Sequence, residues 1–311
     1  MKIVIVVFIV FLIIFSAVLA SCEYFLRFAL GRNNSFEEKN EMDQDGVFSS
    51  SKAKDVMKEG KRFLDSECES VSIKSFDNLR LTAYLKESGK SDYYLITLHG
   101  FHGSADNNAP VFLEAYERGF NILVPHMRAH GGSEGKWITM GRDEAEDVLS
   151  WIEYIKERNE KAKIIVYGVS MGSATTLILS GKESESTVAF IADCGYSSLY
   201  EEYFHEAKEM FGLPSFFVRI INLWSRIRIG LDFSAVNPSE SVKSNTKPLL
   251  IIHGDEDDFV PTWMCYKIYE NAGGDKELLV VPKAGHGESM FVMEDYNDYI
   301  FSWLEKHGIE I

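Results

Sequence analysis

The chain has 311 residues, 46% of them hydrophobic and 25% charged, which is the composition of an ordinary globular protein. Its formal net charge of −15 argues against nucleic-acid binding, because contacts to phosphates require a basic surface. The four cysteines are far apart and form no C-x-x-C pair, so we expect neither a zinc site nor a disulfide framework.

The first predicted element is an apolar run at residues 3–20, which comes after the single charge of Lys2. At a rise of about 1.5 Å per residue, a helix of this length just spans a hydrocarbon core of roughly 30 Å. An aromatic segment with a flanking arginine is next, at residues 24–30, as at a membrane interface. We predict that residues 1–32 form a transmembrane signal anchor and that the protein crosses the cell membrane once. The rest of the chain is expected to be extracytoplasmic, because signal-like starts normally export the domain that is attached to them.

Two other fates of the N-terminal segment remain open. The sequence L-A-S-C that ends at Cys22 has the form of a lipobox, which would make the protein a lipoprotein anchored through that cysteine. Cleavage after Ala20 would instead release a secreted protein, since Val18 and Ala20 are small enough for a signal peptidase.

Residues 33–70 are polar and charged and predict a stalk that leads into a short helix at residues 54–64.

Two segments of alternating polarity, residues 71–76 and 79–85, then meet at an Asp-Asn pair, which predicts a β-hairpin. Further strands are expected at residues 93–98, 121–125, 163–167, 188–193, 248–252 and 278–282, and helices at residues 110–118, 143–158, 171–180, 262–271 and 296–306. Short β-branched runs that alternate with helices predict an α/β fold. Its central, mostly parallel sheet is covered by helices on both faces, with the hairpin at one edge.

A candidate nucleophile lies in the sequence G-V-S-M-G at residues 168–172, between the strand at residues 163–167 and the next helix. Glycines suit a strand-to-helix turn too tight for side chains, the nucleophile elbow, so Gly168 and Gly172 would let the hydroxyl of Ser170 rise clear of the sheet. The helix N-terminus at this point favours developing negative charge. The motif alone also fits an ordinary glycine-containing turn, but its position between strand and helix favours a nucleophile.

A serine hydroxyl needs a base, and His286 is the best candidate among eight histidines. It lies in the loop after the last predicted strand, which gives the chain order serine, acid, histidine. The acid should come from the loop after the strand at residues 248–252, where four consecutive carboxylates, residues 255–258, leave the choice open on spacing alone. His99 and His253 each end a strand and are expected to pack or to form hydrogen bonds.

An oxyanion hole requires two convergent backbone N–H groups. One should belong to Met171, the residue after the serine, and the other to Phe101, in a glycine-containing loop after the strand at residues 93–98. His126 and His130 are four residues apart but lie in a glycine-rich loop, so a metal pair is not expected there. No cofactor is expected either, because acyl transfer through a serine needs none.

With these motifs, residues 71–311 resemble a domain of the α/β-hydrolase superfamily. Within it, the chain is similar to bacterial membrane-anchored hydrolases grouped with serine aminopeptidase-like and acyl-esterase-like domains. The resemblance is carried by L-H-G-F at residues 98–101, R-A-H-G-G-S-E-G at residues 128–135, G-V-S-M-G at residues 168–172, D-C-G-Y at residues 193–196, the segment from H-G to V-P at residues 253–261, and G-H at residues 285–286. In the family pattern H-G-x-x-D-x-x-V-P the acid is the fifth residue, which is Asp257 here. Relatives commonly have an aspartate in place of His126, a departure that concerns the hydrogen bonding of that loop.

The same resemblance implies a helical lid at residues 197–238, an insertion rich in aromatic side chains. Its apolar character suggests an acyl or aromatic group in the substrate pocket. The candidate lid contacts are Tyr196, Tyr200, Phe204, Phe217 and Trp224. The alternative is that these residues only pack the lid onto the body, because any lid helix needs an apolar face.

The resemblance implies a serine hydrolase that cleaves carboxylic esters or thioesters of small or lipid-derived acyl groups through an acyl-enzyme. A second hypothesis is a serine peptidase or aminopeptidase-like amide hydrolase, because the same three residues cleave amides. A third is a non-catalytic, membrane-anchored interaction scaffold, which the intact serine, histidine and aspartate count against. The expected partners are a small-molecule or lipid-derived ester and the membrane, with neither nucleic acid nor metal.

Overall fold

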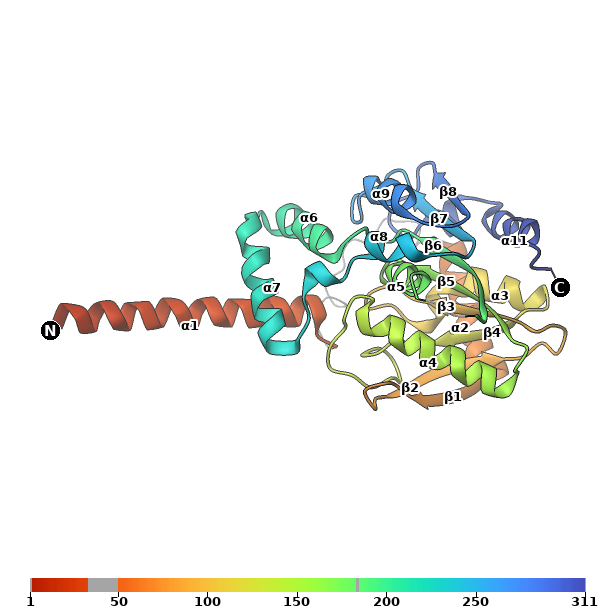
Figure 1. Cartoon of the computed structure of the whole chain (residues 1–311), viewed down its shortest axis with the longest axis horizontal. Helices are drawn as coiled ribbons and strands as arrows, with labels where there is room; N and C mark the ends of the chain where they lie inside the picture. The colour runs from red at the N-terminus through yellow and green to blue at the C-terminus, as the bar shows by residue number, and fades with distance from the viewer. Residues whose placement is uncertain (1, 33–49, 183–184, 311) are drawn as a thin grey trace.

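The computed structural model describes residues 2–32, 50–182 and 185–310 (Figure 1). Its centre is an eight-stranded sheet in the order β1-β2-β4-β3-β5-β6-β7-β8. The pairs β1–β2 and β2–β4 are antiparallel, and the remaining pairs are parallel. The predicted α/β fold, with a hairpin at one edge of a mostly parallel sheet, is confirmed.

The strands are β1 (Glu69–Lys74), β2 (Arg80–Lys86), β3 (Tyr93–Leu98), β4 (Asn121–Pro125), β5 (Lys163–Val169), β6 (Thr187–Asp193), β7 (Leu249–Gly254) and β8 (Lys276–Val281). The α-helices are α1 (Lys2–Leu30), α2 (Ser51–Glu67), α3 (Ala109–Glu117), α4 (Arg142–Arg158), α5 (Met171–Ser180), α6 (Leu199–Phe211), α7 (Ser215–Ile229), α8 (Pro238–Ser241), α9 (Trp263–Asn271), α10 (Ser289–Val292) and α11 (Tyr296–Lys306). Short 3₁₀ helices lie at Ala105–Asn108, Phe233–Ala235 and Val242–Ser244. Each strand and helix that the sequence pattern predicts is present, with shifts of a few residues at some ends.

The sheet is covered on both faces because its central strands are apolar on both sides. In β5, Ile164 and Val166 pack into one core with residues of α4, α5 and α9. Ile165 and Tyr167, which alternate with them, pack into a second core with residues of α2, α3 and α11. This two-residue alternation is the geometry of a pleated strand buried on both faces.

Helix α1 contains the predicted membrane anchor and ends inside the body. Its residues 3–15 are exposed, and the helix is long and apolar enough to cross a membrane. Leu26 and Leu30, near its end, are wholly buried in the core, and the N–H of Ile138 donates to the carbonyl oxygen of Leu30 at 2.8 Å. Figure 1 shows α1 as a long red rod that projects from the body, with α6 and α7 beside its inner end. The last turns of α1 are therefore part of the folded body.

The predicted stalk falls partly outside the described residues, because residues 33–49 are not among them. The short helix predicted after the stalk is α2, and it packs on α3. A Cβ on Gly60 would lie 2.3 Å from the Cβ of Ala109, which shows how closely the two helices approach. Leu64 of the same helix is buried in the core. The boundaries of anchor, stalk and hydrolase domain remain predictions.

Candidate active site

Ser170 occupies the sharp turn between β5 and α5, with φ 56° and ψ −118°. Few side chains adopt such a backbone conformation, and it is the strained conformation of a nucleophile elbow. The flanking glycines are required by close packing. A Cβ on Gly168 would lie 2.2 Å from the carbonyl oxygen of Gly172, and one on Gly172 would lie 2.2 Å from that of Leu98.

The loops after β7 and β8 bring Asp257 and His286 to this serine. The Nε2 atom of His286 lies 2.8 Å from Oγ of Ser170, and its Nδ1 lies 2.9 Å from Oδ2 of Asp257. A neutral imidazole with its proton on Nδ1 satisfies both contacts, since it donates to the carboxylate and accepts from the hydroxyl. Of the four consecutive acidic residues, Asp257 is the one that reaches the histidine. Asp255 instead accepts a hydrogen bond from the N–H of Lys283.

Asp257 is held as an anion by the groups around it. Burial alone would raise its pKa, but the positive charge of His286 in its protonated form and the hydrogen bonds from His253 and His286 outweigh burial and hold the pKa well below its usual range. The N–H groups of Phe259 and Val260 also donate to Oδ1, at 3.1 and 2.8 Å. The carboxylate can therefore fix the orientation of the imidazole and stabilise its positive form.

Both predicted oxyanion donors belong to segments next to Ser170. Met171 is the first residue of α5, where a helix has backbone N–H groups without an intrahelical acceptor. Phe101 lines the cavity above the serine. Its neighbour Gly100 approaches Ser170 so closely that a Cβ on Gly100 would lie 3.3 Å from the Cβ of Ser170. The loop that carries Phe101 is thus within reach of an acyl oxygen bound at Ser170.

Two buried histidines, His99 and His130, join the loop after β3 to the loop after β4. The N–H of Met127 donates to Nε2 of His99 at 3.1 Å, and the N–H of His102 donates to Nε2 of His130 at 3.0 Å. Nδ1 of His130 lies 2.9 Å from the carbonyl oxygen of Arg128, so this nitrogen carries the proton. Burial lowers the pKa of His130 to about 4, which keeps its ring neutral and its Nε2 an acceptor. The hydrogen-bonding role expected for His99 is observed, whereas the positioning role of His130 was not predicted.

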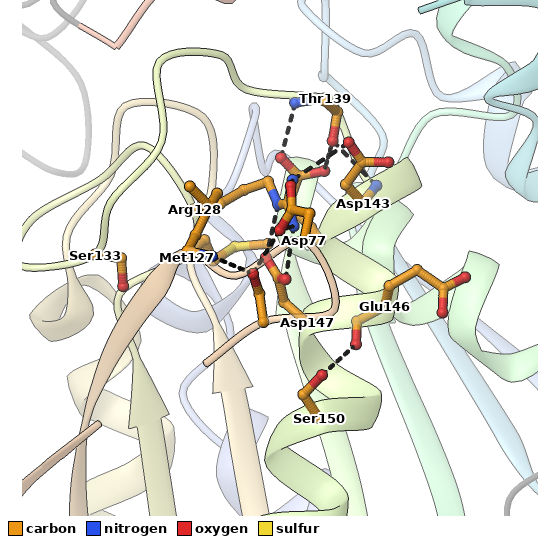
Figure 2. A network of polar contacts seen from close by, with 12 residues as sticks. Asp77, Met127, Arg128, Ser133, Thr139, Asp143, Glu146, Asp147 and Ser150 are labelled. Carbon is orange, nitrogen blue, oxygen red and sulfur yellow. Dashed lines mark hydrogen bonds and ion pairs between the residues drawn. The ribbon is translucent and has the colours of Figure 1, made fainter. Parts of the chain in front are cut away.

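The loop after β4 is itself anchored by Arg128, as Figure 2 shows. Its side chain is almost wholly buried and forms two bonds of 2.7 Å to the carboxylate of Asp147. Asp77, in the β1–β2 turn, and Asp143, in α4, lie 3.2 and 3.3 Å from Nη1. Burial would lower the pKa of Arg128, but the carboxylates of Asp147, Glu144 and Asp143 outweigh burial and keep the guanidinium charged. His126 also contributes to this loop, because its carbonyl oxygen accepts from Oγ of Ser133 at 2.6 Å.

Replacing Arg128 by methionine is expected to lower the free energy of unfolding by about 3–5 kcal/mol, because it leaves the buried carboxylate of Asp147 without its partner. Arg128→Lys should also be destabilising, since an ammonium cannot form the two parallel bonds. Thermal unfolding of the detergent-solubilised protein measures both, with the exposed Arg80→Met as the matched control. A loss no larger than that of the control would contradict this structural role.

An apolar cavity of about 120 Å³ lies above Ser170. Its lining comes from the loop around Phe101, from α6 and α7, and from α1. The residues contributed by α1 are Phe25, Phe28 and Ala29. The end of the predicted anchor therefore forms part of the wall of the candidate active site. The sequence pattern predicted that Phe25 and Phe28 lie at the membrane interface and did not indicate that they line the cavity.

Of the five candidate lid contacts, Tyr196 lines the cavity, and its hydroxyl donates to the carbonyl oxygen of Met140 at 2.6 Å. The other four lie elsewhere. Phe217 packs edge-on against Phe25, and Nε1 of Trp224 donates to Glu23 at 3.0 Å. Tyr200 packs against the core, and Phe204 is exposed. Two of the five thus hold the lid to α1, as in the packing alternative.

The fold and the arrangement around Ser170 define an α/β-hydrolase. Residues 101–308 match the prolyl oligopeptidase family, and the chain belongs to that family. Among solved structures it is similar to the esterase Pf2001 of Pyrococcus furiosus, with a TM-score of 0.66 and 27% identity over 79% of this chain and 93% of that one. It is also similar in fold to Est1E of Butyrivibrio proteoclasticus, solved with ferulic acid, with a TM-score of 0.60 and 21% identity over 76% of this chain and 99% of that one.

The chain is also similar to curated proteins from bacteria, yeast and fish. YqkD of Bacillus subtilis is 28% identical over 63% of this chain, and the match spans 65% of that protein, slightly less than two thirds. Protein bem46 of Schizosaccharomyces pombe is 26% identical over 78% of both chains. The lysophosphatidylserine lipase ABHD12 of Danio rerio is 24% identical over 63% of this chain and 51% of its own length. These likenesses agree with a place in the α/β-hydrolase superfamily.

Proposed function

We propose that the protein is a serine hydrolase that cleaves carboxylic esters or thioesters by a Ser-His-Asp acyl-enzyme mechanism. The observation that carries this proposal is the hydrogen-bonded series from Ser170 through His286 to Asp257, with distances of 2.8 and 2.9 Å, below an apolar cavity. No cofactor takes part.

In this mechanism His286 accepts the proton of Ser170 as Oγ attacks the acyl carbon. Asp257 stabilises the imidazolium that forms. The N–H groups of Phe101 and Met171 stabilise the negative charge that develops on the acyl oxygen. His286 then protonates the leaving alcohol or thiol, and a water molecule, deprotonated by the same histidine, releases the acid from Ser170.

A lipid-derived acyl substrate at the cell membrane is supported by the surroundings of the cavity. Helix α7 leaves Phe216, Ile220, Leu223 and Ile227 exposed. Their spacing of four, three and four residues places them on one face of the helix. The same helix packs against α1, so this apolar face lies next to the predicted membrane span. An apolar acyl chain could pass from the bilayer into the cavity along this side (Figure 1).

The proposal includes the predicted division of the chain. Residues 1–32 would be the membrane anchor and residues 71–311 the hydrolase domain, with residues 197–238 as its lid. The signal-like start supports an extracytoplasmic position for the catalytic domain. The esterase and lipase names of two similar proteins support ester cleavage. The family match supports amide hydrolysis as the second candidate function, since that family is named for peptidases.

The full-length protein in non-ionic detergent should hydrolyse p-nitrophenyl esters with a kcat/KM at least about 100-fold above that for aminoacyl p-nitroanilides, a difference of roughly 2.7 kcal/mol in transition-state free energy. Esters from acetate to decanoate would give the preferred acyl length, with Ser170→Ala as the control for non-enzymatic hydrolysis. A preference for the anilides would replace the esterase proposal with the peptidase.

A further inference from the structure

Two glutamates of the lid line the cavity above Ser170. Glu202 and Glu206 are four residues apart on α6 and therefore lie on the same face of that helix. Glu202 is only 3% exposed. Neither of its carboxylate oxygens has a hydrogen-bond partner among the residues that the structure describes, and the same holds for Oε2 of Glu206. Buried carboxyl groups are normally paired, so this pair requires an explanation.

No structural role accounts for the pair. Within the described part of the chain, no lysine, arginine or histidine lines the cavity that the two carboxyl groups face. Burial raises the pKa of Glu202 well above its usual range, and the charges of Glu206 and Asp257 raise it further. Burial, with Asp257 and then Glu209, raises the pKa of Glu206 to about 7. The negative charges nearby thus oppose ionisation, and an apolar residue at either position would pack at lower free-energy cost.

The rest of the lining is suited to a positive charge. Many of the lining side chains are aromatic, among them Phe25, Phe28, Phe101, Tyr203, Phe211 and Phe259. Aromatic faces attract an ammonium group, most strongly where water is excluded. The carboxyl groups of Glu202 and Glu206 lie among these rings, and no cationic side chain of the described residues lines the cavity beside them. In their ionised form they would complement the charge of an ammonium group. Together the two features specify an organic cation attached to an apolar body.

We propose that Glu202 and Glu206 bind an ammonium group carried by the substrate, so that the natural ester is a cationic one. This substrate class rests on the proposed function, whereas the binding of the cation does not. The ammonium group would replace the proton or protons held by the pair and would sit in the same cavity as the ester bound at Ser170.

The test uses esters that differ by one atom. The first pair is the p-nitrophenyl ester of trimethylammoniobutyrate and its carbon isostere, in which a tert-butyl group replaces the trimethylammonium group. The second pair places the same difference on the alcohol, as butyrylcholine and its carbon isostere. For the full-length protein in non-ionic detergent, kcat/KM for the cationic member of at least one pair should exceed that for the neutral member by about 10- to 100-fold.

The Glu202→Gln/Glu206→Gln variant should bring this ratio to about one, and Glu206→Gln alone should lower it. Glu240→Gln is the matched control, because Glu240 is an exposed carboxylate that does not line the cavity, and it should leave the ratio unchanged. Circular dichroism and thermal unfolding check that each variant is folded. If the double variant does not fold, the ratio for Glu206→Gln decides. A ratio of one or less in the wild type for both pairs would overturn the inference, as would a preference for the cation that survives the loss of the carboxylates.

A binding measurement separates this inference from the proposed function. Hexyltrimethylammonium should bind the full-length Ser170→Ala protein in isothermal titration calorimetry, and its affinity should fall at least about tenfold when both glutamates are replaced by glutamine. If the Ser170→Ala protein binds the cation but the wild type hydrolyses no ester, the proposed function is overturned and the cation site is supported. Hydrolysis of the neutral esters without binding or cation preference would overturn the cation site alone.

Discussion

The Ser170→Ala, His286→Ala and Ser170→Ala/His286→Ala variants are expected to hydrolyse esters equally slowly, with kcat about 10⁵- to 10⁶-fold below the wild type. The reason is that the hydroxyl and the imidazole, 2.8 Å apart, act as one unit. Without the base the hydroxyl is a poor nucleophile, and without the nucleophile the base has no proton to accept. Initial rates with a p-nitrophenyl ester measure the effect. The matched control is His205→Ala, a half-buried histidine of the lid that contacts neither Ser170 nor His286.

Additive losses in the double variant would contradict this account, because they would mean that the two side chains act independently. Equal and small losses, within about tenfold of the wild type, would show that hydrolysis takes place elsewhere on the protein.

Asp257→Asn is expected to lower kcat by about 10³- to 10⁴-fold while KM for a short ester changes little. An amide at this position cannot compensate the imidazolium charge, and its NH₂ group can impose the wrong tautomer on His286. Asp255→Asn is the matched control, since that carboxylate bonds to the backbone N–H of Lys283 and not to the histidine. Equal effects of the two changes on kcat would contradict the assignment of the acid.

The same substitution should alter the dependence of stability on pH. Because the pKa of Asp257 in the folded protein lies below its unfolded value of about 3.9, its ionisation stabilises the fold fully above that value. This contribution is lost as the pH falls below about 4 toward the folded pKa. The free energy of unfolding of Asp257→Asn should therefore fall less steeply over this acid range than that of the wild type, as measured by denaturant titration at a series of pH values.

The fold and the centre of the site were predictable because both depend on local patterns. The alternation of strands and helices predicted a mostly parallel sheet covered on both faces, and the position of G-V-S-M-G after β5 identified Ser170. Spacing alone did not separate Asp257 from its acidic neighbours. That choice came from the resemblance, and the structure places Asp257 within hydrogen-bonding distance of His286 because its carboxylate is turned inward by the N–H groups of Phe259 and Val260.

The walls of the cavity could not be predicted, because they form between segments far apart in the chain. Phe25 and Phe28 lie in a segment whose apolar pattern is fully explained by a membrane interface, yet both line the cavity. Glu202 and Glu206 have the spacing of a solvated helix face, and only the packing of α6 shows that Glu202 is buried and that both line the cavity. Trp224 was expected to contact substrate, but it reaches Glu23 on α1.

The central claim, that Ser170 is an activated nucleophile, is tested most directly by labelling the full-length protein with a fluorophosphonate probe and locating the adduct by mass spectrometry. The account predicts one adduct, on Ser170, in the wild type, and none at that position in Ser170→Ala. Absence of labelling in a folded wild-type protein, or an adduct confined to another residue, would contradict it.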